Sequence, residues 1–214
     1  MNRRALLPVL VALALAAPAA ARAQAAMPSL ALTLLGGVAK PDAALADYQW
    51  DTRPTATGGA QAMVTFGAWG GGLRWTQTSN TQQLGSTAST TEATVRTRAF
   101  EAVARRTLAG FAGQSLFADA AVGRTRLSYR PDHVTVDAGG TPVEVTLAPI
   151  DSWSWGGGLG TERALGSSLV GGLELGYRAF ALDAANQSGG QVVVERRTFA
   201  EWSTRFTLGW RFRA

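Results

Sequence analysis

The carboxyl-terminal stretch of the chain reads EWSTRFTLGWRF from Glu201 to Phe212. Its even positions are apolar or aromatic apart from Thr204, and its odd positions are polar, charged or glycine. Strict alternation of this kind is typical of a β-strand with one apolar and one polar face. About eleven residues is the length of a tilted strand that crosses a bilayer, whereas a strand of a soluble sandwich is usually nearer five or six residues. The stretch therefore predicts a membrane-crossing strand.

The same alternation recurs along the rest of the chain. We expect strands at residues 29–39, 45–54, 61–77, 93–108, 114–129, 147–163, 168–182 and 192–212. In the third of these we place Met63, Trp69, Leu73 and Trp75 on one apolar face. The second is the weakest, because Pro54 interrupts a hydrogen-bond ladder, and it is inferred partly because a closed barrel of this kind needs an even number of strands.

The connections between these segments differ in length. Residues 109–113 and 163–167 are short, whereas residues 78–91, 130–146 and 183–191 are longer and polar. Short turns at one end and longer loops at the other are typical of up-and-down barrels in membranes. The sequence therefore predicts an all-β fold, an eight-stranded antiparallel up-and-down transmembrane β-barrel that follows a cleaved signal peptide.

The amino-terminal residues have the features of a secretory signal. Arg3 and Arg4 precede an apolar core at residues 6–17, and residues 23–25 (Ala-Gln-Ala) offer a small-residue cleavage site. The core is shorter than the roughly 20 residues that a membrane-spanning helix needs. We expect residues 1–25 to be a signal peptide and residues 26–214 to form the membrane β-barrel domain.

Composition narrows the possible functions. The chain is 46% hydrophobic and 16% charged, with eight Phe and seven Trp, which excludes a disordered protein. It has no Cys, so disulfides, thiolate metal sites and cysteine nucleophiles are excluded. The formal charge of +5 comes partly from the signal, because cleavage removes Arg3, Arg4 and Arg22. The small basic excess that remains gives no argument for nucleic-acid binding, and we expect no cofactor and no metal site.

Alternation alone does not say which face of the strands points inward. A secreted lipocalin-like barrel would turn the apolar face inward, but the polar face here is rich in Gly, Ser, Ala and Thr, which suits the narrow interior of an eight-stranded barrel. Trp residues at strand ends suit the aromatic girdles of a membrane protein. We expect a luminal charge network of Glu101, Asp119, Glu174, Arg178, Glu201 and Arg205. Such a network holds a narrow barrel rigid, and the alternative is a narrow pore for small solutes.

Two segments carry a resemblance to a known group of proteins. The stretch WSWGGGLGTE at residues 153–162 leads through Ser168 into GLELGYR at residues 172–178. It resembles the penultimate hairpin of small outer-membrane β-barrel proteins of the OmpA, OmpW and opacity-protein group. The final FTLGWRF at residues 206–212 is similar to the terminal signal that the barrel-assembly machinery reads in that group.

The resemblance implies a location and a broad role. It implies the outer membrane of a Gram-negative bacterium, with outer-membrane lipid and lipopolysaccharide as surroundings and the barrel-assembly machinery as a partner. It implies a non-enzymatic structural, envelope-integrity or surface-interaction role, and we expect a monomer.

Two motifs contain residue types that can carry chemistry. His133, the single histidine, lies in the longest expected outer loop, with Ser128, Asp132 and Glu144 nearby in sequence. A barrel enzyme that modifies lipid A would need Ser, His and an acid to converge on the outer surface, but no motif supports this alternative, and we expect no catalytic residue. The glycine run at residues 156–160 is followed by alternating residues instead of the helix that a phosphate-binding loop requires. We expect these glycines to permit strand bending or close packing in the lumen.

Four arginines are expected near the outer rim, on the lipid-facing side of one hairpin: Arg96, Arg98, Arg124 and Arg126. If residues 109–113 form the turn, Arg98 lies beside Arg124 and Arg96 beside Arg126, with no acidic side chain nearby on that face. Closely spaced guanidinium groups need anions, and lipopolysaccharide phosphates would supply them. We therefore predict lipopolysaccharide contact at these four residues; the alternative is a solvated extension of the hairpin above the membrane.

Overall fold

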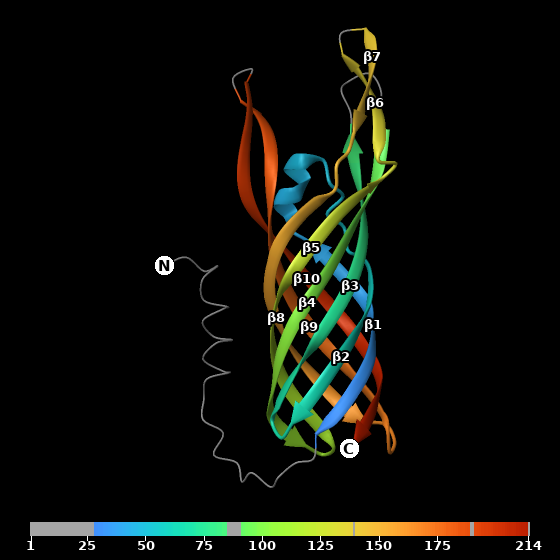
Figure 1. Ribbon diagram of the computed structural model, residues 1–214, viewed down its shortest axis with the longest axis vertical. Coiled ribbons are helices and arrows are strands. Elements are labelled where there is room, and N and C mark those ends of the chain that lie inside the picture. The colour runs from blue at the N-terminus through green and yellow to red at the C-terminus, as the bar shows by residue number, and fades with distance from the viewer. Residues whose placement is uncertain (1–27, 85–90, 139, 189–190, 214) are drawn as a thin grey trace.

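The computed structural model describes residues 28–84, 91–138, 140–188 and 191–213, and its strands form one closed barrel (Figure 1). The barrel strands are β1 (Ser29–Pro41), β2 (Thr55–Phe66), β3 (Trp69–Leu84), β4 (Thr91–Phe111), β5 (Gln114–Arg130), β8 (Ile150–Ala164), β9 (Leu169–Ser188) and β10 (Gln191–Arg213). Neighbouring strands are antiparallel, and β1 pairs with β10 to close the ring. The predicted eight-stranded antiparallel barrel is confirmed. The expected signal peptide lies outside the described residues.

Two of the expected strands are wrong, although their total number is right. Residues 45–54 do not form a barrel strand: they contain most of a 3-10 helix, η2 (Ala43–Tyr48), and an isolated bridge from Trp50 to β3. The expected strand at residues 61–77 spans two strands, β2 and β3, which are joined by a turn at Gly67. Gly67 has a φ of 58°, and a positive φ is what tight two-residue hairpin turns require. That hairpin supplies the eighth strand.

The segment between β1 and β2 folds into the barrel mouth for local reasons. Pro41 and Pro54 bracket it, and neither has a backbone N–H to donate to a ladder. Asp42 caps η2, because its Oδ1 accepts a hydrogen bond from the Ala44 backbone N–H at 3.1 Å. Its Oδ2 accepts from the backbone N–H of Ala200 on β10 at 3.2 Å, which ties the start of η2 to the barrel wall.

The two ends of the barrel differ. Short turns join β2 to β3, β4 to β5 and β8 to β9 at the end where β10 finishes (Figure 1). In the β4–β5 turn, Ala112 and Gly113 both have positive φ, 49° and 78°. At the opposite end stand η2, the tip of β9 and β10, and a separate hairpin of β6 (His133–Ala138) and β7 (Thr141–Thr146). This hairpin occupies most of the connection that we expected to be a loop.

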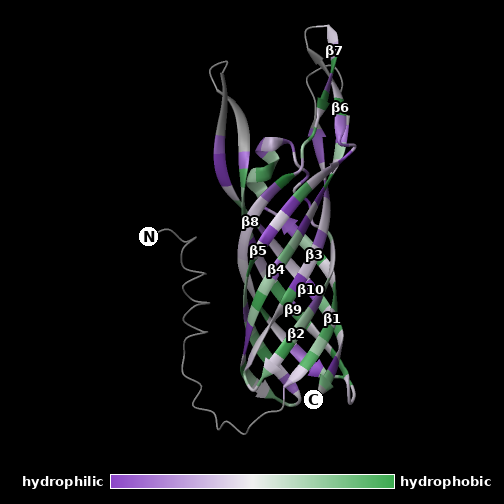
Figure 2. Cartoon of the chain, in the orientation of Figure 1, coloured by the Kyte–Doolittle hydropathy of each residue, from purple (hydrophilic) through white to green (hydrophobic). Residues whose placement is uncertain are grey.

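The outward face of the barrel is apolar. Figure 2 shows hydrophobic residues alternating with hydrophilic ones along the barrel strands. In β10 the expected facing is observed, because Leu208 and Phe206 are exposed while Glu201 and Arg205 are buried. Exposed apolar side chains on the other barrel strands include Leu30, Leu32, Leu34, Val64, Phe66, Leu73, Leu116, Val122, Leu159, Leu173 and Leu175. Among the described residues, no helix is long and apolar enough to cross a membrane.

The expected facing of Met63 is wrong. Its side chain is 2% exposed and lies inside the barrel, whereas Trp69, Leu73 and Trp75 are exposed on the outside. The β2–β3 turn explains the difference, because Phe66 pairs directly with Trp69. Partner residues share a face, so the outward positions are even in β2 and odd in β3.

An apolar cluster closes the barrel at its loop end. Inward-facing residues of β4, β5, β9 and β10 form it together with residues of the η2 segment. Its buried members are Leu45, Trp50, Val95, Leu127, Phe180, Leu182 and Phe199. Burying a large apolar side chain contributes about 1.5–3 kcal/mol, so this cluster holds η2 in the mouth.

Candidate functional site

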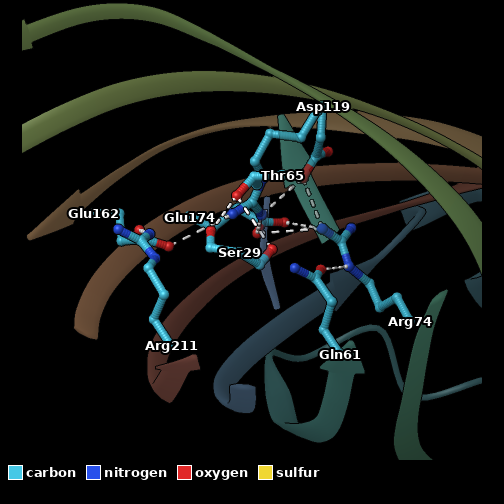
Figure 3. Close-up of polar contacts among 9 residues, drawn as sticks. Ser29, Gln61, Thr65, Arg74, Asp119, Glu162, Glu174 and Arg211 are labelled. Carbon is cyan, nitrogen blue, oxygen red and sulfur yellow. Dashed lines mark hydrogen bonds and ion pairs between the residues drawn. The ribbon is translucent and has the colours of Figure 1, made fainter. Parts of the chain in front are cut away.

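Five side chains from five strands form the centre of an ion network in the lumen, and Figure 3 labels Arg74, Asp119 and Glu174 among them. Glu174 of β9 contacts Arg205 of β10 at 2.5 Å, Arg74 of β3 at 3.1 Å and Arg105 of β4 at 3.3 Å. Asp119 of β5 contacts Arg74 at 2.6 Å and Arg105 at 3.4 Å. Both carboxylates are 0% exposed. The barrel wall therefore holds two buried carboxylates among three guanidinium groups.

A second group of polar side chains adjoins this centre on the loop side. Arg178 of β9 contacts Glu201 of β10 at 2.5 Å and donates to the hydroxyl oxygen of Thr76 at 2.9 Å. The hydroxyl of Thr78 lies 3.3 Å from Oε2 of Glu201 and donates to it. Strand β3 thus contributes side chains to both groups, and these side chains contact β9 and β10 across the lumen.

The ion pairs follow the strand register. Opposite charges stand directly across a ladder at four places: Arg74 and Glu101, Arg105 and Asp119, Glu174 and Arg205, and Arg178 and Glu201. Directly opposed unlike charges stabilise a strand pair. All six residues that we expected in the network are buried on the inner face. Glu174 and Arg178, four residues apart on β9, each contact a residue of β10 rather than each other.

Arg74 is missing from the residues that we expected in the network, whereas Arg105, which alternation places on the inward polar face, contacts both central carboxylates. Arg74 is 2% exposed, and its Nε also donates to Oε1 of Gln61 on β2 at 2.8 Å. Toward the turn end, Glu162 contacts Arg211 and lies 3.9 Å from Arg105. The alternation contained the signal for both arginines, since each lies on the polar face of its segment.

Glycines make room for the network. A Cβ atom at Gly158 would stand 3.2 Å from Oδ1 of Asp119 and 3.3 Å from Oε1 of Glu174. A Cβ atom at Gly176 would collide with the guanidinium of Arg205. Gly158 belongs to the glycine run, which lies within β8 and precedes no helix. The run therefore serves close packing in the lumen.

Little space is left inside the ion network. A cavity of about 10 Å³ lies among Arg74, Glu101, Arg178 and Arg205. A cavity of that size holds about one water molecule. Around these four residues the described side chains are therefore closely packed, and the apolar cluster of the mouth lies on the loop side of them.

Aromatic side chains form a belt on the outward face, on the loop side of the exposed residues Leu73, Leu159 and Leu208. Trp75 pairs directly with Phe100 across β3 and β4. Farther around the wall, the rings of Trp155 and Tyr177 are 6.0 Å apart and those of Tyr177 and Trp202 are 4.9 Å apart. Such belts lie at the headgroup level of membrane proteins. The belt consists of Trp75, Phe100, Trp153, Trp155, Tyr177 and Trp202.

The expected arginine cluster lies on the outward face of β4 and β5, but its expected register is wrong. Arg98 is directly opposite Arg126 rather than Arg124, and Arg96 lies two residues farther toward the loops. The hairpin turn has two residues instead of five, and a bulge in β4 shifts the register. Nε of Arg98 donates to Oε1 of Gln77 at 3.0 Å. We call Arg96, Arg98, Arg124 and Arg126 the arginine stripe.

The stripe begins within the aromatic belt. Arg124 has Phe100 directly opposite on β4 and Trp153 directly opposite on β8, and its guanidinium lies 5.2 Å from the Trp153 ring centre. The expectation of no acid near the stripe is wrong, because Asp151 of β8 lies 3.9 Å from Arg126. The acid was missed because it belongs to a strand outside the hairpin.

His133 stands at the start of β6 and is exposed. Its Nδ1 lies 3.0 Å from Oδ1 of Asp132, and this hydrogen bond lowers the pKa of the Asp132 carboxyl. Both residues line a cavity of about 570 Å³ together with Ser128 and Arg96, while Glu144 does not. In the described part of the chain, no hydrogen bond joins Ser128 to His133. The same part of the chain holds no group of three acidic or histidine side chains placed to bind a metal ion.

Comparison with known proteins identifies the architecture. No protein-family model and no curated protein sequence matches the chain. The crystal structure of Neisserial surface protein A matches with a TM-score of 0.54 and 13% identity, covering 86% of this chain and 97% of its own. The outer membrane protein OprG from Pseudomonas aeruginosa matches with a TM-score of 0.53 and 10% identity, covering 89% of this chain and 98% of its own. The chain therefore has the fold of a small outer-membrane β-barrel protein.

Proposed function

We propose that the protein is a non-enzymatic outer-membrane barrel of a Gram-negative bacterium, with a structural, envelope-integrity or surface-interaction role. The observation that carries the proposal is the arginine stripe, which starts at the level of the aromatic belt. The packed ion network and the apolar cluster in the mouth favour this role over a pore for small solutes.

The partner that the stripe fits best is lipopolysaccharide. Aromatic belts mark the headgroup level, so arginines beside the belt reach the phosphates of the outer leaflet. Arg98 and Arg126 face each other directly, and like charges so placed destabilise a strand pair unless anions lie between them. Asp151 supplies one carboxylate, and bidentate phosphate contacts would satisfy the remaining guanidinium groups.

Replacing Arg98 and Arg124 together with glutamine is expected to lower the melting temperature in bilayers that contain lipopolysaccharide and to change little in neutral phospholipid. Each phosphate of a zwitterionic phospholipid is paired with an ammonium group of the same headgroup, whereas the lipid A phosphates of lipopolysaccharide carry uncompensated charge, so the arginines matter most where lipopolysaccharide is present. Thermal unfolding followed on unboiled gels measures the difference. The matched control is the double substitution of Arg196 and Arg197, exposed arginines beside Asp183 and Glu195 above the barrel. Equal decreases in melting temperature in both bilayers would mean that the stripe is only a solvated extension of the hairpin above the membrane.

Three further parts of the proposal concern export and assembly. Cleavage after Ala25 would release the barrel domain at residues 26–214. The barrel-assembly machinery would recognise the final strand, whose Phe206 and Phe212 are exposed on the outward face. The protein would then remain a monomer, since its ring is closed by its own strands.

A lipid A-modifying enzyme is the second candidate, because Ser128, Asp132 and His133 line one cavity on the loop side. The contact between Asp132 and His133 joins exposed neighbours in sequence, and the serine is not hydrogen-bonded to the imidazole. We therefore expect no catalysis. Lipid A mass spectra of cells that express the wild type and His133→Ala should be identical. An acyl chain gained or lost only with the wild type would establish the enzyme instead.

A further inference from the structure

A preformed cleft lies in the barrel mouth, between η2 and the strand ends. Its volume is about 350 Å³, at the lower end of the range for small-molecule sites. Leu45, Trp50, Leu182 and Phe199 line it and also belong to the buried apolar cluster beneath. The cleft thus has an apolar floor and suits a small organic molecule rather than a polymer.

Hydrogen bonds hold the walls of this mouth cleft in place. Nε2 of Gln82 on β3 donates to the backbone carbonyl of Tyr48 at 3.0 Å. The backbone N–H of Gln83 donates to the carbonyl of Gln49 at 2.9 Å. With Asp42 bound to β10, the η2 segment is fixed on two sides. A ligand that enters a fixed cleft loses little free energy to ordering the protein.

The mouth cleft is acidic, whereas the cavities beside His133 and Lys40 each contain basic as well as acidic side chains. Asp47 of η2 and Asp183 of β9 line the mouth cleft, and none of its described lining residues is basic. The cavity beside His133 includes Arg96, and a groove on the outer wall includes Lys40. An acidic cleft lined by aromatic side chains favours a cation over an anion or a neutral molecule.

We infer that the mouth cleft binds a small organic cation with an apolar body, such as an aryl or alkyl ammonium compound. The rings of Tyr48 and Tyr129 are partly buried and line the cleft, so they offer aromatic faces to a cation. Asp47 and Asp183 attract the charge, and the apolar floor takes the hydrocarbon. This site is separate from the arginine stripe and does not depend on lipopolysaccharide.

Arg196 is the one described basic side chain that contacts a carboxylate of the cleft. It lies 4.0 Å from Asp183, and both side chains are largely exposed. A pair so exposed is weak, so a bound ammonium competes with it easily. Removing Arg196 should therefore strengthen cation binding, whereas removing the aspartates should weaken it.

The test uses the full protein in lipid nanodiscs and follows the indole N–H resonance of Trp50, which is assigned with Trp50→Phe. The probe is benzyltrimethylammonium, and the neutral isostere neopentylbenzene is the comparison. We expect a saturable shift with the cation and about tenfold weaker binding in the double variant Asp47→Asn with Asp183→Asn. Arg196→Gln should bind the cation more tightly than the wild type.

Asp132→Asn is the matched control, because Asp132 is an exposed carboxylate near the loops but outside the cleft. Its cation affinity should equal that of the wild type, and all variants should keep the gel mobility of the folded barrel. Three results would overturn the inference: no saturable shift, equal affinity for the neutral isostere, or equal affinity of the double aspartate variant. The second of these would assign the cleft to neutral hydrocarbons.

Discussion

Glu174→Gln is expected to lower the free energy of unfolding by about 3–5 kcal/mol, the usual cost of leaving buried charges without their partner. Glu174 contacts Arg74, Arg105 and Arg205, and it has no exposed surface. Glutamine keeps the shape but removes the charge, so three guanidinium groups lose their common counterion. Urea titration in phospholipid vesicles, followed by tryptophan fluorescence, measures the change.

The matched control is Asp151→Asn in the same neutral vesicles. Asp151 and Arg126 form an exposed pair at 3.9 Å, and such pairs contribute less than about 1 kcal/mol. A second variant tests the cause: Glu174→Gln combined with Arg205→Met removes a guanidinium that has lost its partner and should be more stable than Glu174→Gln alone. If Glu174→Gln were as stable as Asp151→Asn, the ion network would not hold the barrel together.

Leu208→Arg is expected to cost about 2–4 kcal/mol, because an arginine on the lipid face near the membrane centre must leave water. Leu208 is 45% exposed on the outward face of β10, well below the aromatic belt member Trp202. The measurement is the fraction folded after insertion into vesicles, read from gel mobility, together with urea titration.

Val143→Arg is the matched control, because Val143 is as exposed as Leu208 but is surrounded by water rather than lipid. Val143 is 44% exposed on β7, in the hairpin above the barrel, where an arginine remains in water. We expect Val143→Arg to fold like the wild type, and Thr207→Arg, one residue from Leu208 on the luminal face, to fold better than Leu208→Arg. Equal folding of Leu208→Arg and Val143→Arg would show that the outward face of β10 does not contact lipid.

Within a single strand, the sequence was a reliable guide to facing. Alternation in β10 correctly placed Leu208 on the outward face and Arg205 on the inward face, because successive side chains of an extended strand point to opposite sides. The network residues Glu174 and Glu201 were found for the same reason, since a charge on the polar face of a narrow barrel has only the lumen to occupy. Closure into a barrel also followed, because a membrane leaves no unpaired edge, but the eighth strand came from the hairpin at Gly67 rather than from residues 45–54.

Which residues of neighbouring strands lie opposite each other, and on which face, was decided only by the tertiary structure. A two-residue turn at Gly67 moved the outward face from even to odd positions and placed Met63 inside. A bulge in β4 placed Arg98 opposite Arg126, and β8 brought Asp151 beside that pair. Turn length and bulges change by single residues, and a shift of one residue reverses a face while a shift of two changes every partner.

In the η2 segment too, one feature followed from the local sequence and another only from tertiary contacts. Pro54 already argued against a barrel strand there. Leu45 and Trp50 are buried only because inward-facing apolar side chains at the barrel mouth pack against them. Sequence alternation thus determined which side chains face lipid or lumen within each strand. The contacts between strands required the folded barrel, because they join residues far apart in the chain whose distance depends on register. The same is true of the mouth cleft, which η2 completes.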